Sequence, residues 1–135
     1  MKGRIGRLPE RVSGVLRDWR LEFNKASRGI PGAGFANILP CPGDEVEGIL
    51  YAVTEEELER LDRYEGVPCH YRRRQVNVER GDTGELVTAV TYVAAPSKVK
   101  DGLKPTRKYL LHLLAAKDCL SQEYVRRLQA VKTLD

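Results

Sequence analysis

The feature that most constrains the fold is a change in the spacing of apolar residues along the chain. Up to Ala94 most segments alternate apolar and polar residues, which is the period of a strand, whereas beyond Pro96 apolar residues recur at helical spacing. Strands first and helices mostly last predict an α+β fold: a small mixed, mostly antiparallel β-barrel or curled sheet with flanking helices. Because 135 residues can bury one continuous core, we expect a single domain over residues 1–135.

The first half of the chain is predicted to contain three extended segments. Residues 12–23 alternate in polarity, and residues 24–34 are rich in glycine, proline, serine and asparagine, which predicts a long loop. A short strand at 35–39 and a second strand at 46–53 are separated by CPGDE, which we interpret as a turn. Both faces of the second strand carry apolar residues, so we expect it to be central in the sheet.

Helix ends and a hairpin are marked by local signals. Thr54 and Glu57 fit a capping box, and Gly66 fits a C-terminal cap, so a helix is predicted between them. The segments on either side of GDTG predict a β-hairpin, because aspartate and glycine tolerate positive φ. Two more helices are predicted, one after Pro105 and one capped by Ser121.

Composition excludes several classes of protein. No apolar run approaches the roughly 20 residues that cross a bilayer, so we expect no membrane partner. Residues 1–14 are basic but lack the apolar block of a signal peptide, which favours a cytoplasmic location. The three cysteines are an odd number without CxxC spacing, and we interpret them as reduced thiols.

The basic balance of the chain raises the question of an acidic partner. The net charge is +4 with a pI near 9.0. The densest run, Arg72 to Arg74, falls in a predicted strand, so Arg72 and Arg74 share one face while Arg73 points to the other. Because no aromatic platform is interleaved with these residues, we expect no nucleic-acid partner.

Glu65 is the residue whose position is least expected. It follows Leu58 and Leu61 at i+7 on the predicted helix, so its carboxylate continues the stripe that packs into the core. A carboxylate turned into a core is harder to ionise, which suits a general base that works near neutral pH. The alternative is that Glu65 lies at the edge of the stripe and pairs with an arginine. Asp62 is the local rival, for which we favour a structural bond to an amide or an arginine.

Other candidates are weaker. Cys69 and His70 are adjacent on a predicted strand, point to opposite faces and have no second ligand pair at zinc spacing, so we predict no metal. His112 lies among leucines, where we expect a packed histidine rather than a ligand. The loop PGAGF resembles a phosphate cradle but has no following lysine or helix start.

Several motifs together resemble one known family. In order and spacing, GFANI, PGDEVEGILY and LDRYEGV followed by Tyr71 resemble the γ-glutamylcyclotransferase family, which has the γ-glutamylcyclotransferase or γ-glutamylamine cyclotransferase fold. The likeness runs from about Val12 to the C-terminus. The resemblance implies a cofactor-free reaction in which a γ-glutamyl amine or peptide is cyclised to 5-oxoproline and the amine is released. It also implies that Glu65 is the general base and that Tyr71 and Tyr109 contact the substrate, while either tyrosine could instead serve the core.

One departure from the family pattern leaves an alternative open. Family members typically begin with an apolar strand that leads into a YGSN-type loop, whose backbone amides receive the substrate, and this sequence contains no such segment. The alternative is therefore a non-catalytic small-molecule-binding or assembly module with the same fold. A missing strand would also expose a sheet edge, so we expect a possible homodimer through strand pairing.

Overall fold

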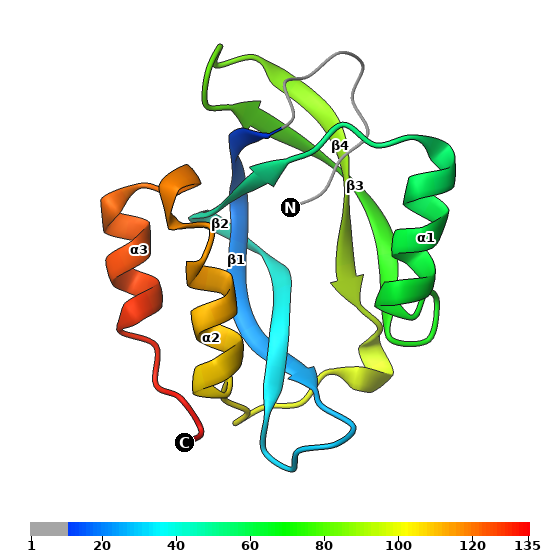
Figure 1. The fold of residues 1–135 in the computed structure, drawn as a ribbon, viewed down its shortest axis with the longest axis vertical. Coiled ribbons are helices and arrows are strands. Elements are labelled where there is room, and N and C mark those ends of the chain that lie inside the picture. Colours follow the sequence, from blue (N-terminus) through cyan, green and yellow to red (C-terminus); the bar gives the residue numbers. More distant parts are fainter. Residues whose placement is uncertain (1–10) are drawn as a thin grey trace.

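Four strands form one antiparallel sheet in the computed structural model, which describes residues 11–135 (Figure 1). The strand order is β2-β1-β3-β4. The elements are β1 (Val12–Ala26), β2 (Gly34–Leu50), α1 (Glu55–Glu65), β3 (Tyr71–Arg80), β4 (Leu86–Ala94), α2 (Arg107–Leu114) and α3 (Gln122–Gln129), with short 3-10 turns at Pro96–Lys98 and Lys117–Cys119. The predicted α+β class is confirmed, with a curled sheet and flanking helices.

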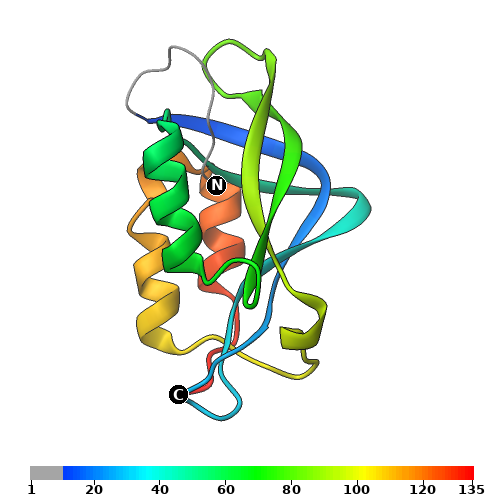
Figure 2. The ribbon, with the colours of Figure 1, turned by 90° about the vertical axis from the view of Figure 1, so that its right-hand side faces the viewer.

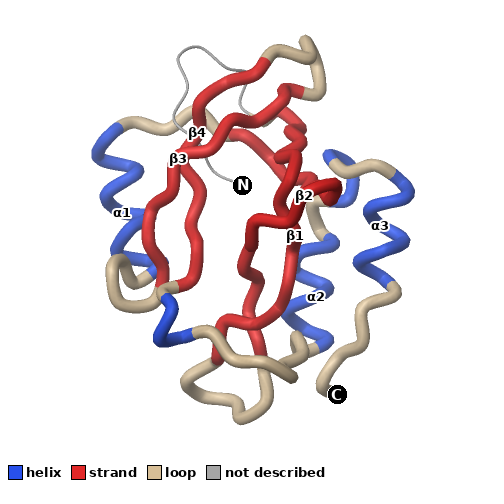
Figure 3. Tube along the Cα trace, turned by 180° about the vertical axis from the view of Figure 1, so that it is seen from behind, coloured by secondary structure: helices blue, strands red, loops and turns tan. Residues whose placement is uncertain are grey.

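The helices are divided between the two halves of the sheet. Helix α1 flanks β3, whereas α2 and α3 flank the β1–β2 hairpin (Figure 1). Seen from the side, all three helices lie on the same side of the curled sheet (Figure 2). From behind, the long β1–β2 hairpin and the β3–β4 hairpin are seen to splay apart toward one end (Figure 3). Residues of the sheet and of all three helices line one pocket between them.

All four strands contribute to the main apolar cluster. Leu50 and Val78 have no exposed surface, and Ala89 is 1% exposed. The cluster consists of Val12, Leu16, Ile38, Val46, Leu50, Val76, Val78 and Ala89. β1 and β3 pair directly only at two positions near Gly14. The two hairpins are therefore held together mainly by burial of these apolar side chains.

The turn that we predicted at CPGDE is wrong. β2 is one strand that pairs with β1 on both sides of this segment, and residues 41–44 form a bulge opposite Asp18. The Gly43 N–H donates to Asp18 Oδ1 at 3.0 Å. Both residues have positive φ, 66° for Asp18 and 87° for Gly43, which aspartate and glycine tolerate. Glycine and proline here mark a bend within a strand.

The central position that we predicted for residues 46–53 is also wrong. In the sheet of the described residues β2 lies at an edge, and it ends at Leu50. Its second apolar face is covered by the C-terminal segment, where Leu120 and Tyr124 line a pocket together with Ile49. Two apolar faces here reflect helices packing on a strand. Homodimerisation through a sheet edge stays a prediction.

A second bulge, near the other end of the β1–β2 hairpin, prepares the site. β1 continues to Ala26, three residues further than predicted, so the connecting loop is shorter than expected. Phe23 and Asn24 of β1 together lie opposite Ala36 of β2. A bulge of this kind removes backbone groups from the strand ladder. The backbone groups of Ala36 are bound by side chains instead.

The predicted local signals are confirmed. The Thr54 hydroxyl accepts from the Glu57 N–H at 3.1 Å, and the Glu57 carboxylate accepts from the Thr54 N–H at 3.0 Å. Gly66 ends α1 with φ 71°. Ser121 caps α3, and the β3–β4 hairpin forms at the predicted place.

The ends and the cysteines add two observations. Within residues 11–135, none of the helices combines the length and apolar character that crossing a membrane requires. The signal-peptide interpretation concerned residues 1–14, and residues 1–10 lie outside the part of the chain described. Cys41, Cys69 and Cys119 are all unpaired thiols, as predicted.

Gly34 provides a test of how closely the two hairpin strands approach. A Cβ on Gly34 would collide with the carbonyl oxygen of Phe23 and lie 2.8 Å from the Cβ of Leu103, whereas one on Gly29 would meet nothing within 4 Å. We expect Gly34→Ala to lower the free energy of unfolding by about 3 kcal/mol, because backbone and side chains must shift. Urea unfolding of both variants measures this. Equal stability of Gly34→Ala and Gly29→Ala would contradict the close approach.

Candidate functional site

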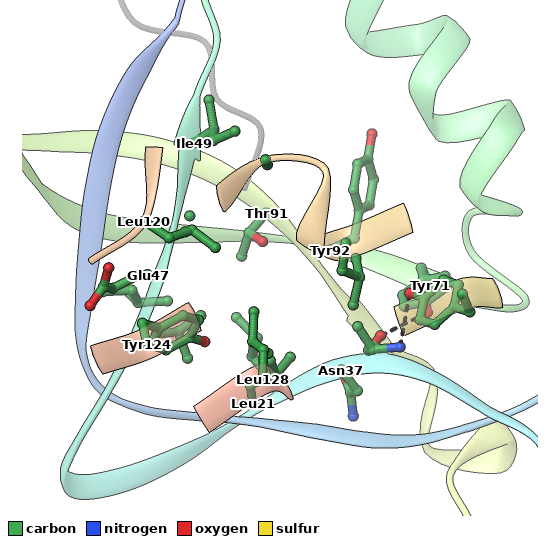
Figure 4. A pocket seen from close by; sticks show the side chains of 18 of the residues that line it. Leu21, Asn37, Glu47, Ile49, Tyr71, Thr91, Tyr92, Leu120, Tyr124 and Leu128 are labelled. Atoms are coloured by element: carbon green, nitrogen blue, oxygen red, sulfur yellow. Dashed lines mark hydrogen bonds between the residues drawn. The ribbon is translucent and has the colours of Figure 1, made fainter. Parts of the chain in front are cut away.

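The space between the sheet and the helices contains a pocket of about 320 Å³. Its two ends differ in chemistry (Figure 4). One end is polar and carries Asn37, Glu65, Tyr71, Tyr92 and Tyr109. The other end is mostly apolar and carries Ile49, Leu113, Leu120, Tyr124 and Leu128, with Glu47 beside them. The pocket therefore presents one end suited to polar chemistry and a longer apolar wall.

The peptide groups of Ala36 connect two of the predicted site residues. Tyr71 on β3 donates its hydroxyl hydrogen to the Ala36 carbonyl at 2.8 Å. The Ala36 N–H donates to the hydroxyl oxygen of Tyr109 on α2 at 3.1 Å. The Tyr109 ring also packs edge-on against Phe35, with centroids 5.0 Å apart. Ala36, which lies opposite the bulge in β1, thus holds both tyrosines at the polar end of the pocket.

Both tyrosine hydroxyls remain neutral at physiological pH. Burial raises the pKa of Tyr71, and Tyr109 and Glu65 raise it further. Burial also raises the pKa of Tyr109, although the bond from Ala36 acts in the opposite direction. These groups therefore act as neutral donors and acceptors of hydrogen bonds, not as bases.

The side chain of Glu65 points inward, as the helical spacing from Leu58 and Leu61 predicted. It is the last residue of α1, is half-buried and lines the pocket. Leu58, two helical turns earlier, is 3% exposed, so this face of the helix packs inward. The negative charge of Glu65 contributes to the raised pKa of Tyr71 and Tyr109. The carboxylate therefore lines the same pocket as both tyrosines.

Asp62 has the structural role that we favoured. Its Oδ1 accepts from Arg73 Nε at 2.9 Å and from the Tyr92 hydroxyl at 2.7 Å. The hydrogen bond from Arg73 holds the pKa of Asp62 below its usual range, and Tyr92 acts in the same direction. Asp62 therefore ties α1 to the β3–β4 hairpin and leaves Glu65 as the carboxylate of α1 that lines the pocket.

Sequence reasoning missed Asn37, which is 2% exposed. Its Oδ1 accepts from the Ala94 N–H at 2.8 Å, and its Nδ2 donates to Asn24 Oδ1 at 3.0 Å. These bonds link β2 to β4 and to the bulge in β1. The available signal was a single amide within the apolar strand FANIL, since a buried amide is retained when its hydrogen bonds are satisfied.

Lys25 was also missed, and it changes the interpretation of His70. Lys25 is 5% exposed, and its Nζ lies 3.2 Å from His70 Nδ1. Cys69 is exposed. Across residues 11–135 no three His, Cys, Asp or Glu side chains gather as a metal site would require. His70 contacts the buried lysine, which the sequence did not indicate.

The packed histidine that we expected at position 112 is wrong. His112 is exposed, because Leu110 turns the opposite side of α2 into the core. Arg73 and Arg74 point to opposite faces of the strand, as predicted. Arg73 turns toward Asp62, while the guanidinium of Arg74 lies over the Trp19 ring, 5.4 Å from its centroid. These arginines have partners within the fold.

The chain matches known proteins over most of its length. The model of the AIG2-like family matches residues 45–128. AIG2-like protein D of Arabidopsis thaliana is 34% identical over 93 residues, 67% of this chain and 56% of that protein. Gamma-glutamylcyclotransferase of Homo sapiens is 30% identical over 129 residues, 89% of this chain and 65% of that protein. The chain therefore spans about half to two thirds of the length of these relatives.

A solved structure gives the same result for the fold. A gamma-glutamyl cyclotransferase structure superposes with a TM-score of 0.81 at 27% identity, covering 92% of this chain and 75% of that one. The fold is thus that of a γ-glutamylcyclotransferase-like protein. The chain belongs to the AIG2-like family, and the resemblance that the motifs indicated is confirmed.

The bond network of Asp62 makes stability depend on pH. We expect Asp62→Asn to lower the free energy of unfolding by about 1 kcal/mol at pH 7, since a partly exposed ion pair is screened by solvent. Because Arg73 lowers the pKa of the folded carboxyl, this stabilisation is present above the unfolded pKa of about 4 and is lost as the pH falls through the folded pKa. Thermal unfolding from pH 7 to pH 3 measures it. The exposed Asp101→Asn is the control, and an Asp62→Asn deficit that persists unchanged at pH 3 would contradict this account.

The Ala36 bond predicts a local effect of Tyr109→Phe. Loss of the hydroxyl leaves the Ala36 N–H without its partner, which we expect to cost about 1–2 kcal/mol of unfolding free energy. Amide exchange at Ala36, followed by NMR, should become at least about tenfold faster. Tyr51→Phe is the matched control, because the Tyr51 side chain is half-buried outside this pocket. Unchanged exchange at Ala36 would refute the assignment.

Proposed function

We propose that the chain cyclises γ-glutamyl amines or peptides to 5-oxoproline and releases the amine, with Glu65 as general base. The observation that carries this proposal is the position of Glu65 beside Tyr71 and Tyr109 in one pocket, in a chain similar to γ-glutamylcyclotransferases. The partner that we propose for this pocket is a small-molecule γ-glutamyl substrate.

The proposed reaction exchanges one C–N bond for another and moves two protons from the α-nitrogen to the leaving nitrogen. Glu65 takes a proton from the α-ammonium of the substrate, and the free α-amine attacks the γ-carbonyl carbon. A new C–N bond closes a five-membered ring, and the carbonyl oxygen becomes negative. As the bond to the leaving amine breaks, the leaving nitrogen receives the first proton from Glu65. The ring nitrogen then gives up its second proton through Glu65, and the amine takes it up and leaves as an ammonium ion. Closure is intramolecular, so holding the substrate folded supplies much of the rate.

The bonds to Ala36 suggest different tasks for the two tyrosines. Tyr109 accepts from Ala36, so its own hydroxyl hydrogen is not used in that bond and can be donated to the carbonyl oxygen as it becomes negative. Tyr71 donates its hydrogen to Ala36, so its oxygen can accept from the α-ammonium. Both tasks require neutral hydroxyls, which agrees with the raised pKa of each tyrosine.

The rest of the proposal follows from the chemistry. The steps use no cofactor, because only protons move between protein and substrate. A cytoplasmic location goes with the three unpaired cysteines, since thiols stay reduced there.

The test is release of 5-oxoproline from a panel of γ-glutamyl amino acids and γ-glutamyl amines. We expect Glu65→Gln to lower kcat about a thousandfold, because the amide cannot take the proton. Glu56→Gln, an exposed substitution in the first turn of the same helix, should retain wild-type activity. Undiminished activity of Glu65→Gln would refute the mechanism, and no product with any member of the panel would refute the function for this chain.

A further inference from the structure

A buried cation lies behind the polar end of the pocket. The Lys25 ammonium lies 5.6 Å from the ring centroids of both Phe35 and Tyr71, and its Nζ donates to His70 Nδ1 at 3.2 Å. With 5% of its surface exposed, Lys25 is among the most deeply buried charged residues of the described chain. None of its contacts within residues 11–135 is a carboxylate ion pair.

Burial of an ammonium without an ion-pair partner costs stability, which raises the question of what the charge does. Burial lowers the pKa of Lys25, and the nearby positive charges of Lys98 and Arg28 lower it further, while the negative charge of Glu65 opposes them. The pKa of His70 is lowered by burial and by Lys25, so its imidazole is neutral and can accept the hydrogen bond. Two aromatic faces and a neutral imidazole are partial compensation for a desolvated ammonium.

The pocket itself lacks a positive charge. Its charged lining residues are Glu47 and Glu65, and no lysine or arginine of the described chain lines it. A γ-glutamyl group, however, brings an α-carboxylate as well as an α-ammonium. An anionic group next to Glu65 would be repelled unless a cation stood close behind the wall. Lys25 is that cation, because the Tyr71 ring that it contacts is itself part of the lining.

We propose that the Lys25 ammonium is the positive charge against which the pocket holds the α-carboxylate of the γ-glutamyl group, acting across Tyr71. This rests on the proposed function, and it makes Lys25 a specificity-determining, positioning residue. Lys98 and Arg28 are less suited to the task because they are more exposed, and solvent and salt screen exposed charges. His70 holds the ammonium in place.

The first test compares two substrates that differ only in the α-carboxylate. A γ-glutamyl amide cyclises to 5-oxoproline, and the 4-aminobutanoyl amide of the same amine cyclises to 2-pyrrolidinone. We expect Lys25→Met to lower kcat/KM for the γ-glutamyl amide about tenfold, as loss of a charge-assisted contact does, and to change that for the 4-aminobutanoyl amide less than about twofold. Lys25→Arg should restore most of the preference. A merely structural role would lower both values together and would overturn the proposal.

The second test measures binding, so that it does not depend on catalysis. NMR titration compares 5-oxoproline with 2-pyrrolidinone on the wild type, Lys25→Met and the control Lys98→Met. We expect the wild type and Lys98→Met to prefer 5-oxoproline and Lys25→Met to lose that preference. If the wild type releases no product yet shows this pattern, the proposed function fails while the role of Lys25 stands. An equal preference in the wild type and Lys25→Met would overturn the role of Lys25 even if Glu65-dependent activity were found.

A third measurement needs only the wild type and covers the case in which Lys25→Met does not fold. Because Lys25 is buried, the preference for 5-oxoproline over 2-pyrrolidinone should persist in about 0.5 M salt, where exposed charges are screened within a few ångströms. Loss of the preference at high salt would assign it to surface cations such as Arg28, and would overturn the proposal.

Discussion

The polar end of the pocket depends on the hydrogen bonding of the backbone N–H and C=O of one residue, Ala36. The bulge of Phe23 and Asn24 in β1 takes Ala36 of β2 out of the strand ladder, and the carbonyl and N–H of Ala36 are bound by Tyr71 and Tyr109 instead. A β-bulge, a second hairpin and a C-terminal helix therefore meet at one residue with a methyl side chain. Because buried backbone groups require partners, a change in the bulge would move both tyrosines at once.

Much of the fold could be predicted because its signals are local. The capping box at Thr54, the left-handed glycine at position 66 and the GDTG hairpin each involve a few adjacent residues, and each formed as predicted. The direction of Glu65 followed from helical spacing in the same way, since Leu58 fixes the inward face of α1. The roles of Glu65, Tyr71 and Tyr109 in catalysis came from the family resemblance, and they stay predictions.

The features that could not be predicted depend on register between strands. CPGDE has the composition of a turn, and only the pairing of residues on both sides of it shows that β2 continues through a bulge at Asp18. The bonds of Asn37 to β4, and the position of Lys25 between Phe35 and Tyr71, likewise require knowledge of which residues face each other. A single polar residue in an apolar extended segment can signal burial, but it does not indicate which residues of other strands it will contact.

The junction between β2 and α3 has a consequence for the order in which the pocket is completed. Both oxygens of Glu47 accept from Ser121, from its N–H at 2.7 Å and from its hydroxyl at 2.6 Å, so a strand carboxylate fastens the start of the last helix. Leu120, Tyr124 and Leu128, which form much of the apolar wall, are thereby contributed by a segment that follows all four strands in the sequence. During synthesis the sheet and Glu65 therefore leave the ribosome before that wall does, so the binding pocket is completed only after both hairpins and α1 have been made.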